Sequence, residues 1–137
     1  MARQDDPALS GALVVYRRIP PFGNRCQWPD DGSEPHFSSM NFSDDDDEMS
    51  VYLETETTPQ RVIELGEIAG CPGCGIATIT LGEIRSICGA DVIIFRDDVD
   101  RSDGHVLVFG NIKTSVRKKL QKAARWLPGH FPTRPSG

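Results

Sequence analysis

The sequence predicts a single α+β domain with a mixed or antiparallel sheet of about five strands and three helices. Its 137 residues are the length of one domain, and its 38% hydrophobic and 26% charged residues are ordinary for a globular protein. Short β-branched segments and segments with helical periodicity follow in the order β, long loop, β, α, β, α, β, β, α. This order is typical of an α+β domain.

Two strands and a helix are expected in the first half of the chain. Residues 13–19 are β-branched and aromatic and are followed by two prolines, which predicts a strand that ends there. Residues 50–54 predict a second short strand. Pro59 suits the first turn of a helix, and Thr57 or Thr58 can cap that helix.

A long acidic loop is expected over residues 22–49. This stretch has no sustained hydrophobic periodicity, and five adjacent acidic residues lie near its end. Adjacent like charges repel one another and cannot be buried together, so the run is exposed. Loops this long in compact domains are usually functional or mobile, which makes the run a candidate partner-binding segment. Its aspartates are Asp44, Asp45, Asp46 and Asp47.

The middle of the chain predicts a strand that leads directly into a helix. Residues 76–80 are apolar and β-branched, and residues 81–88 have a helical apolar face. Thr80 and Glu83 have the spacing of a capping box, and Gly89 is suited to the C-terminal end of the helix.

A hairpin and a helix are expected after it. Residues 91–96 are nearly all apolar, which predicts a central strand buried on both faces, and residues 105–109 supply its hairpin partner. The last helix is expected over residues 114–127. Its apolar stripe consists of Val116, Leu120, Ala123, Ala124 and Leu127.

The two ends of the chain lack apolar periodicity. Residues 1–10 and 128–137 are therefore expected to be flexible, which leaves a domain over residues 11–127. The N-terminus carries acids where a secretory signal needs cations and an apolar stretch, so we expect a cytoplasmic protein without structural disulfides. No run of 18 apolar residues predicts a membrane span.

The charge of the chain is strongly divided. The net charge is −5, but the first 103 residues hold all 20 Asp and Glu against eight Lys and Arg, which gives −12. The remaining residues hold the other seven cations and no acid, which gives +7. Most of these cations lie on or beside the polar face of the last helix. The candidate anion-binding or partner-binding residues there are Lys113, Thr114, Ser115, Arg117, Lys118, Lys119 and Lys122.

Three interpretations of this basic helix remain open. Its cations can simply solvate an exposed face. Lys113, Thr114 and the amides of the first turn can hold an anion, although Ile112 replaces the glycine that a nucleotide-binding loop needs. The acidic remainder of the chain and the lack of aromatic residues among the exposed cations argue against nucleic acid. A partner protein, or the acidic run of this chain or of a second copy, is the favoured contact.

The cysteines suggest a metal site or a redox pair. Cys71-Pro72-Gly73-Cys74 has the spacing of one zinc knuckle, and Cys88 is a third candidate ligand. A redox pair of Cys71 and Cys74 and an ordinary glycine-rich turn are the alternatives, and Cys88 also fits a small apolar residue in a helix. The candidates for a fourth zinc ligand are Cys26, His36 and His105.

Four motifs resemble a group of uncharacterised small bacterial proteins. The resemblance covers residues 13–127, implies one compact domain and brings no known activity. Those proteins carry apolar residues where this chain has Cys71 to Cys74, which argues against a structural metal. The motifs are RRIPP at residues 17–21, MSVYL at 49–53, TLGEIR at 80–85 and HVLVFG at 105–110, followed by the basic helix.

A fainter resemblance is to the RES-domain toxins, which degrade NAD on an ADP-ribosyltransferase-like fold. Arg17 or Arg18 resembles the arginine of that family, and Tyr52 and Glu64 resemble its tyrosine and glutamate. The resemblance implies an arginine that holds the pyrophosphate, a tyrosine that stacks on nicotinamide and a glutamate that stabilises the oxocarbenium-like centre. The Gly-Arg-aromatic-Asn segment of the family is absent.

The leading hypothesis is a non-enzymatic cytoplasmic accessory domain that binds another protein, or a second copy of itself, through the acidic loop and the basic helix. It follows from the strong charge segregation and from the lack of a complete catalytic constellation. No cofactor is needed for this function. A RES-like toxin acting on NAD and a zinc-stabilised domain that binds nucleic acid or protein are the alternatives, and a role in a toxin or defence system is consistent with the first.

Overall fold

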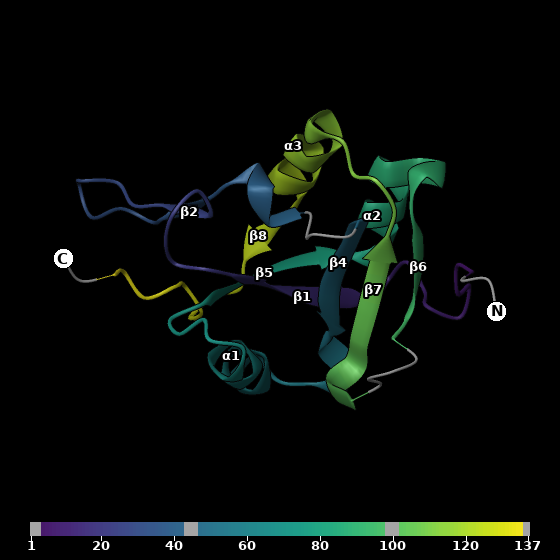
Figure 1. Cartoon of the computed structure of the whole chain (residues 1–137), viewed down its shortest axis with the longest axis horizontal. Helices are drawn as coiled ribbons and strands as arrows, with labels where there is room; N and C mark the ends of the chain where they lie inside the picture. Colours follow the sequence, from purple (N-terminus) through teal and green to yellow (C-terminus); the bar gives the residue numbers. More distant parts are fainter. Residues whose placement is uncertain (1–3, 43–46, 98–101, 136–137) are drawn as a thin grey trace.

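The computed structural model of the chain describes residues 4–42, 47–97 and 102–135, which form an antiparallel six-stranded sheet and a two-stranded ribbon (Figure 1). The strand order of the large sheet is β6-β7-β4-β1-β5-β8. The predicted α+β class is confirmed, and every pairing in the sheet is antiparallel. The strands are β1 (Val14–Ile19), β4 (Glu48–Leu53), β5 (Gly75–Thr80), β6 (Ile93–Arg96), β7 (His105–Phe109) and β8 (Arg125–Trp126).

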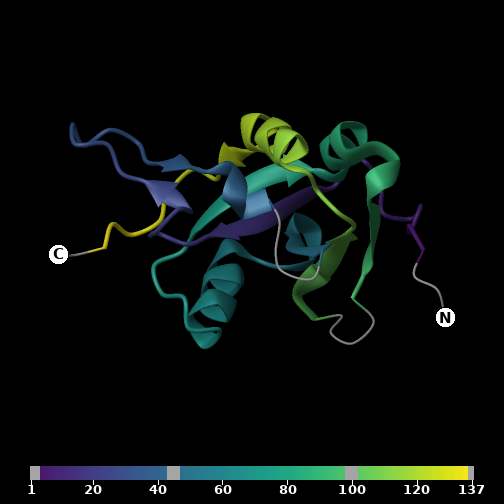
Figure 2. The same ribbon diagram turned by 45° about the horizontal axis from the view of Figure 1, so that its top comes forward.

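Three α-helices cover the two faces of the sheet. Helix α1 (Pro59–Ile68) lies on one face, and α2 (Leu81–Cys88) and α3 (Thr114–Ala123) lie on the other (Figure 2). The predicted starts of α1 and α2 are confirmed, because the Thr58 side chain accepts from the Arg61 amide and Thr80 and Glu83 form a capping box. The short 3-10 turns are η1 (Ser39–Phe42), η3 (Glu54–Glu56), η4 (Gly89–Asp91) and η5 (Ser102–Gly104).

Each face of the sheet has its own apolar core. The larger core lies under α2 and α3 and includes Val15 and Ile19 of β1. The smaller core lies under α1 and includes Tyr16 and Tyr52. Alternate residues of a strand point to opposite faces, so Arg17 shares the face of the larger core and Arg18 shares the face of α1.

The long loop is more ordered than its sequence indicates. It contains the two-stranded ribbon of β2 (Cys26–Gln27) and β3 (His36–Phe37), followed by η1, whose Phe42 is 1% exposed. Phe42 belongs to the larger core, and η1 packs against α3. Of the predicted acidic run, Asp44, Asp45 and Asp46 lie outside the described residues, whereas Asp47 is exposed and Glu48 begins β4.

The prediction of a central strand over residues 91–96 is wrong, because β6 is an edge strand. Its burial comes from the N-terminal segment, which covers the outer edge of β6. The Asp6 amide donates to the Ile94 carbonyl, and the Ile94 amide donates to Asp5 Oδ1, both at 2.8 Å. Leu9 completes this cover, because it is 2% exposed and belongs to the larger core. The N-terminal segment, expected to be flexible, is therefore held against the sheet.

The last helix ends earlier than predicted. Helix α3 stops at Ala123, Ala124 is extended, and Arg125 and Trp126 pair with β5 as the edge strand β8. The Trp126 Nε1–H donates to the Pro35 carbonyl at 2.8 Å, which anchors this strand to the ribbon. Leu127 consequently packs against the core under α1 instead of continuing the stripe of α3.

The C-terminal segment follows β8 onto the loop that carries Cys71 and Cys74, although the sequence predicts a flexible tail. The Ile76 amide donates to the His130 carbonyl at 3.0 Å, and the Thr133 amide donates to the Gly73 carbonyl at 2.8 Å. A Cβ atom at Gly75 would lie 2.5 Å from Pro132, so this approach requires glycine.

The sheet twists sharply between β1 and β4. Strand β1 pairs with β5 along its whole length, but its register with β4 covers only Val15 and Tyr16. In Figure 1, β4 and β7 run steeply across the direction of β1 and β5. The two central strands therefore diverge after Tyr16, and this divergence shapes the second cavity described below.

The docked N-terminal segment can be tested with Leu9→Ala. The substitution removes a fully buried side chain and is expected to lower the free energy of unfolding by about 2–4 kcal/mol in urea denaturation. Ala8→Ser, at an exposed neighbouring position, is the control and should change it by less than about 0.5 kcal/mol. An unchanged stability of Leu9→Ala would show that the segment is flexible in solution.

Candidate functional site

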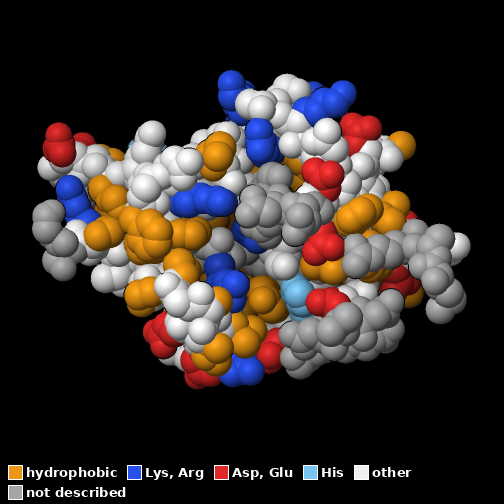
Figure 3. Space-filling view, in the orientation of Figure 1, with side chains coloured by type: hydrophobic (Ala, Val, Ile, Leu, Met, Phe, Trp, Pro, Cys, Tyr) orange, Lys and Arg blue, Asp and Glu red, His pale blue; other side chains and the backbone are white. Residues whose placement is uncertain are grey.

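The outer face of α3 is a strongly basic surface. Leu120 is fully buried against the core, whereas Lys118, Lys119 and Lys122 are exposed. Figure 3 shows blue Lys and Arg side chains over this helix at the top of the molecule. No described residue forms an ion pair with the three lysines. We call this surface, with Lys113 and Arg125 at its two ends, the basic face.

The N-terminal end of α3 holds the predicted anion-binding residues together. Lys113 occupies the N-cap position, and Thr114 and Ser115 are exposed in the first turn. Arg117 is half-buried and donates to Thr114 Oγ1 at 2.7 Å. One hydroxyl of the predicted anion site is thus already used within the helix.

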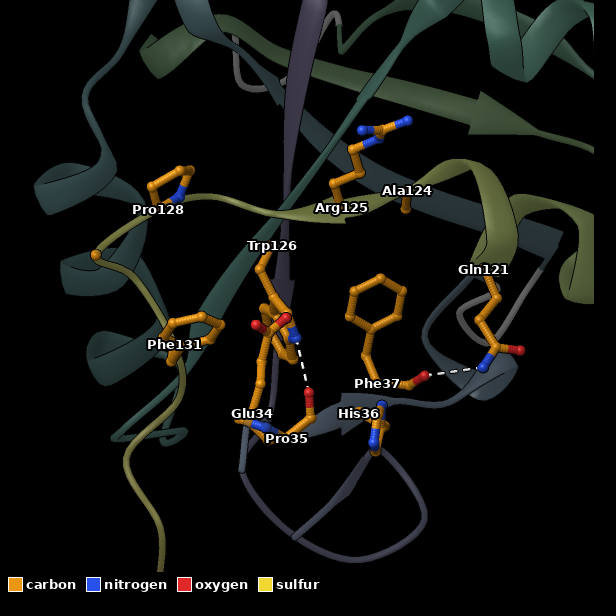
Figure 4. Close-up of a pocket in the computed structure, with 11 residues that line it drawn as sticks. Glu34, Pro35, His36, Phe37, Gln121, Ala124, Arg125, Trp126, Pro128 and Phe131 are labelled. Atoms are coloured by element: carbon orange, nitrogen blue, oxygen red, sulfur yellow. Dashed lines mark hydrogen bonds between the residues drawn. The ribbon is translucent and has the colours of Figure 1, made fainter. Parts of the chain in front are cut away.

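A groove lined by aromatic residues adjoins the C-terminal end of α3 (Figure 4). Its volume is about 590 Å³. Trp126 packs edge-on against Phe37 and Phe131, with ring centroids 4.8 Å and 5.7 Å apart. Gln121 of α3 donates to the Phe37 carbonyl at 3.0 Å and so fixes the helix against the groove. Figure 4 shows the Arg125 side chain pointing away from the aromatic rings. We call this feature the aromatic groove.

A second cavity of about 550 Å³ lies where β1 and β4 diverge. Arg17, Arg18 and Arg25 line it, and none of the described residues that line it is acidic. Figure 3 shows Lys and Arg side chains gathered near the centre of the molecule, over the region where β1 ends in Figure 1. Ser50, Cys71 and Cys74 complete its wall. We call this cavity the arginine cleft.

Two of these arginines are fixed by main-chain carbonyls. Arg17 is 8% exposed, and its guanidinium donates to the carbonyls of Asn41 at 2.8 Å and Ser50 at 3.0 Å. Arg25 donates to the Met40 carbonyl at 2.7 Å. The cleft is thus built by contacts between β1, β4 and the loop that contains η1.

Arg18 belongs to a row of stacked side chains on the α1 face. Its guanidinium lies 5.7 Å from the centre of the Tyr52 ring, a cation–π contact. Tyr52 in turn stacks on His105, with ring centroids 5.1 Å apart, and His105 Nδ1 lies 3.0 Å from Asp97 Oδ2. Asp97 thereby orients the imidazole against the tyrosine.

The structure brings together only part of the RES-like set. Arg18 contacts Tyr52, but Arg17 lies on the opposite face of the sheet. Glu64 is on the surface of α1, with its side chain 57% exposed and paired with Arg61 at 3.2 Å. Neither Glu64 nor Tyr52 lines the arginine cleft.

The candidate metal ligands separate into two places. Cys71 and Cys74 lie together, with their sulfurs 2.9 Å apart, whereas Cys88 is buried in the larger core on the other side of the sheet. Burial raises the pKa of the Cys88 thiol to about 11, as expected for a small apolar core residue. The described residues contain no group of three or more metal-ligating side chains. The candidates for a fourth ligand, Cys26, His36 and His105, lie respectively in β2, in the ribbon at the aromatic groove and at the start of β7.

Several residues of these sites could not be predicted from the sequence. Arg25 lies in a segment without periodicity, so only the three-dimensional course of the loop places it beside Arg18. Phe37, Trp126 and Phe131 come from the ribbon, β8 and the C-terminal segment, and only the early end of α3 brings them together. The only available sequence indication was the unusual length of the loop.

Comparisons with known proteins bring no relative to bear on these sites. No family model, no curated protein and no solved structure matches the chain. Among the described residues, no helix has the length and apolar character needed to cross a bilayer.

Proposed function

We propose that the chain is a non-enzymatic cytoplasmic accessory domain that binds an acidic protein surface through the basic face. The observation that supports this proposal most strongly is that the five exposed cations of the basic face form no ion pair with any described residue. An otherwise acidic chain that concentrates its cations on one helix has a surface complementary to negative charge.

The aromatic groove supplies the apolar contact surface that the basic face lacks. Charges at the rim of an interface mainly set orientation and association rate, whereas buried aromatic residues carry most of the binding energy. The groove begins where the basic face ends, at Gln121 and Arg125. Phe131 is 44% exposed beside Trp126, so an apolar side chain of the partner has aromatic surface to contact. We therefore expect a partner segment with both acidic and apolar residues.

A second copy of the chain is one protein that meets the charge requirement. The acidic run starts two residues after Phe42 in the sequence, and the turn η1 that ends at Phe42 packs against α3. The acidic run of one copy and the basic face of another would then have complementary charge, as the sequence analysis anticipated.

Charge reversal on α3 tests this function. Lys118→Glu, Lys119→Glu and Lys122→Glu combined should weaken partner capture, or self-association in sedimentation velocity, by more than about tenfold. The reason is that the variant places like charges against the acidic partner. The matched control, Lys118→Arg, Lys119→Arg and Lys122→Arg, keeps the charge and should keep the binding.

A separate variant addresses the acidic run. Asp44, Asp45, Asp46 and Asp47 are replaced by Asn, and the same partners and the same self-association are measured. Identical partners and an identical oligomeric state in both the neutralised and the reversed variants would reject the electrostatic proposal.

A RES-like enzyme that degrades NAD or transfers ADP-ribose is the second candidate. The contact between Arg18 and Tyr52 favours it, because these residues are two of the three that carry the resemblance. The exposure of Glu64 and its pairing with Arg61 weigh against it, because a catalytic glutamate must reach the substrate held by the other two.

The two functions differ in what happens to NAD. The binding function predicts that NAD stays intact after long incubation with the purified chain, measured by chromatography. The enzyme function predicts NAD loss that disappears in Arg18→Ala and in Glu64→Ala but persists in Glu67→Ala, an exposed acid on the same helix. NAD consumption with this pattern would replace the binding proposal.

A further inference from the structure

The loop between α1 and β5 holds two thiols in direct contact. Cys71 Sγ and Cys74 Sγ are 2.9 Å apart, and Cys74 also donates to the Cys71 carbonyl at 3.3 Å. A disulfide bond is about 2.05 Å long, so the pair needs only a small movement to form one. The turn between the two residues depends on Gly73, whose φ of 77° lies in the left-handed region.

Three neighbouring segments hold this turn. The Cys71 amide donates to the Gly66 carbonyl of α1 at 2.8 Å, and the C-terminal segment donates to the Gly73 carbonyl from Thr133. On the third side, Cys74 leads into β5 through Gly75, which packs against Pro132. The fold therefore holds the two sulfurs together.

The two thiols differ in exposure. Cys71 is partly exposed, whereas Cys74 is 5% exposed. Burial and the contact with Cys71 raise the pKa of Cys74 to about 12, while the Arg18 guanidinium acts in the opposite direction. An exposed thiol beside a buried one divides the roles in disulfide exchange, since the exposed sulfur can meet a reagent and the buried one can resolve the product.

The surroundings of the pair select the charge of that reagent. Both cysteines line the arginine cleft together with Arg17, Arg18 and Arg25, and the part of the lining that the structure describes contains no acidic residue. A cleft lined by one sign of charge raises the local concentration of ligands of the opposite sign. Guanidinium groups also hold carboxylates in defined orientations.

We propose that Cys71 and Cys74 are a redox-active dithiol, oxidised to a disulfide by a small disulfide that carries carboxylate groups and binds in the arginine cleft. This site is separate from the basic face and does not depend on the proposed binding function.

The reaction is an ordinary double exchange. The Cys71 thiolate attacks one sulfur of the small disulfide, the bond between its two sulfurs breaks, and one small thiolate leaves with the electron pair. Cys74 then loses its proton, attacks the Cys71 sulfur and expels the second small thiolate. The two cysteines are oxidised, the small disulfide is reduced to two thiols, and the two protons from the cysteines end on those thiols.

The other cysteines serve as internal controls. Cys26 is 4% exposed and Cys88 is 4% exposed, and burial raises the pKa of both thiols. Neither lines the arginine cleft. A buried thiol of this kind reacts slowly with a reagent that must reach it directly. Cys74 is as deeply buried, but it differs because its sulfur lies 2.9 Å from the partly exposed Cys71 sulfur, which the reagent can reach.

The experiment exposes the reduced full-length chain to oxidised glutathione, which is anionic, or to cystamine, which is cationic. Remaining thiols are then alkylated and located by peptide mass spectrometry. Oxidised glutathione should remove the thiols of Cys71 and Cys74 together and lower the intact mass by two hydrogen atoms. It should react at least about tenfold faster than cystamine.

Matched variants assign the roles. Cys74→Ser should accumulate a mixed disulfide of glutathione on Cys71, and Cys71→Ser should leave Cys74 reduced. Arg18→Gln combined with Arg25→Gln should abolish the preference for the anionic disulfide. Arg17 is left unchanged in these variants because its guanidinium holds the fold.

Three results would overturn the proposal. The first is that both thiols remain open to alkylation, and the second is that they oxidise without any preference for the anionic reagent. The third is that both thiols are protected with no loss of mass and with one zinc ion per chain by elemental analysis. That last outcome would assign the pair to a metal site instead.

Discussion

The guanidinium of Arg17 links β1 to β4 and to η1, and the arginine cleft and α3 lie next to these elements. A buried charge is costly unless hydrogen bonds replace the water that it loses. Arg17 meets that requirement by donating to the carbonyls of Ser50 in β4 and Asn41 in η1. The register between β1 and β4 ends one residue earlier, at Tyr16. The Arg17 side chain therefore donates to a β4 carbonyl next to the point where strand pairing ends.

The same contact has consequences on both sides of the sheet edge. By binding η1, Arg17 holds Phe42 in the larger core and keeps η1 packed against α3. By allowing β1 and β4 to diverge, it opens the arginine cleft in which Arg18, Arg25 and the dithiol meet. The net charge of −5 conceals this arrangement, because the cations are concentrated on α3 and around the cleft.

Local signals in the sequence predicted much of the fold. The capping residues Thr58 and Thr80 and the proline at the start of α1 act over a few residues, so their effect can be recognised in the chain alone. The position of β6 could not be recognised in that way. An apolar sequence of this kind suits a central strand and also an edge strand whose outer side is covered. The cover of β6 comes from residues almost 90 positions away in the sequence.

The candidate sites were less predictable for the same reason. The cations of α3 follow one another on one helix, so their common face is visible in the spacing. Arg18, Arg25 and the cysteine pair come from three segments that only the divergence of β1 and β4 brings together. Similarly, the end of α3 at Ala123 depends on the pairing of Trp126 with β5 and on its bond to Pro35, which are long-range contacts.

The central role of Arg17 is tested most directly by the stability of Arg17→Met, measured by urea denaturation beside wild type and Arg17→Lys. Methionine fills similar space but leaves the carbonyls of Asn41 and Ser50 without this donor, so the free energy of unfolding should fall by about 2–4 kcal/mol. Lysine keeps the charge but lacks the planar fork that reaches both carbonyls, and should restore less than half of the loss. A stability of Arg17→Met within about 0.5 kcal/mol of wild type would contradict the account.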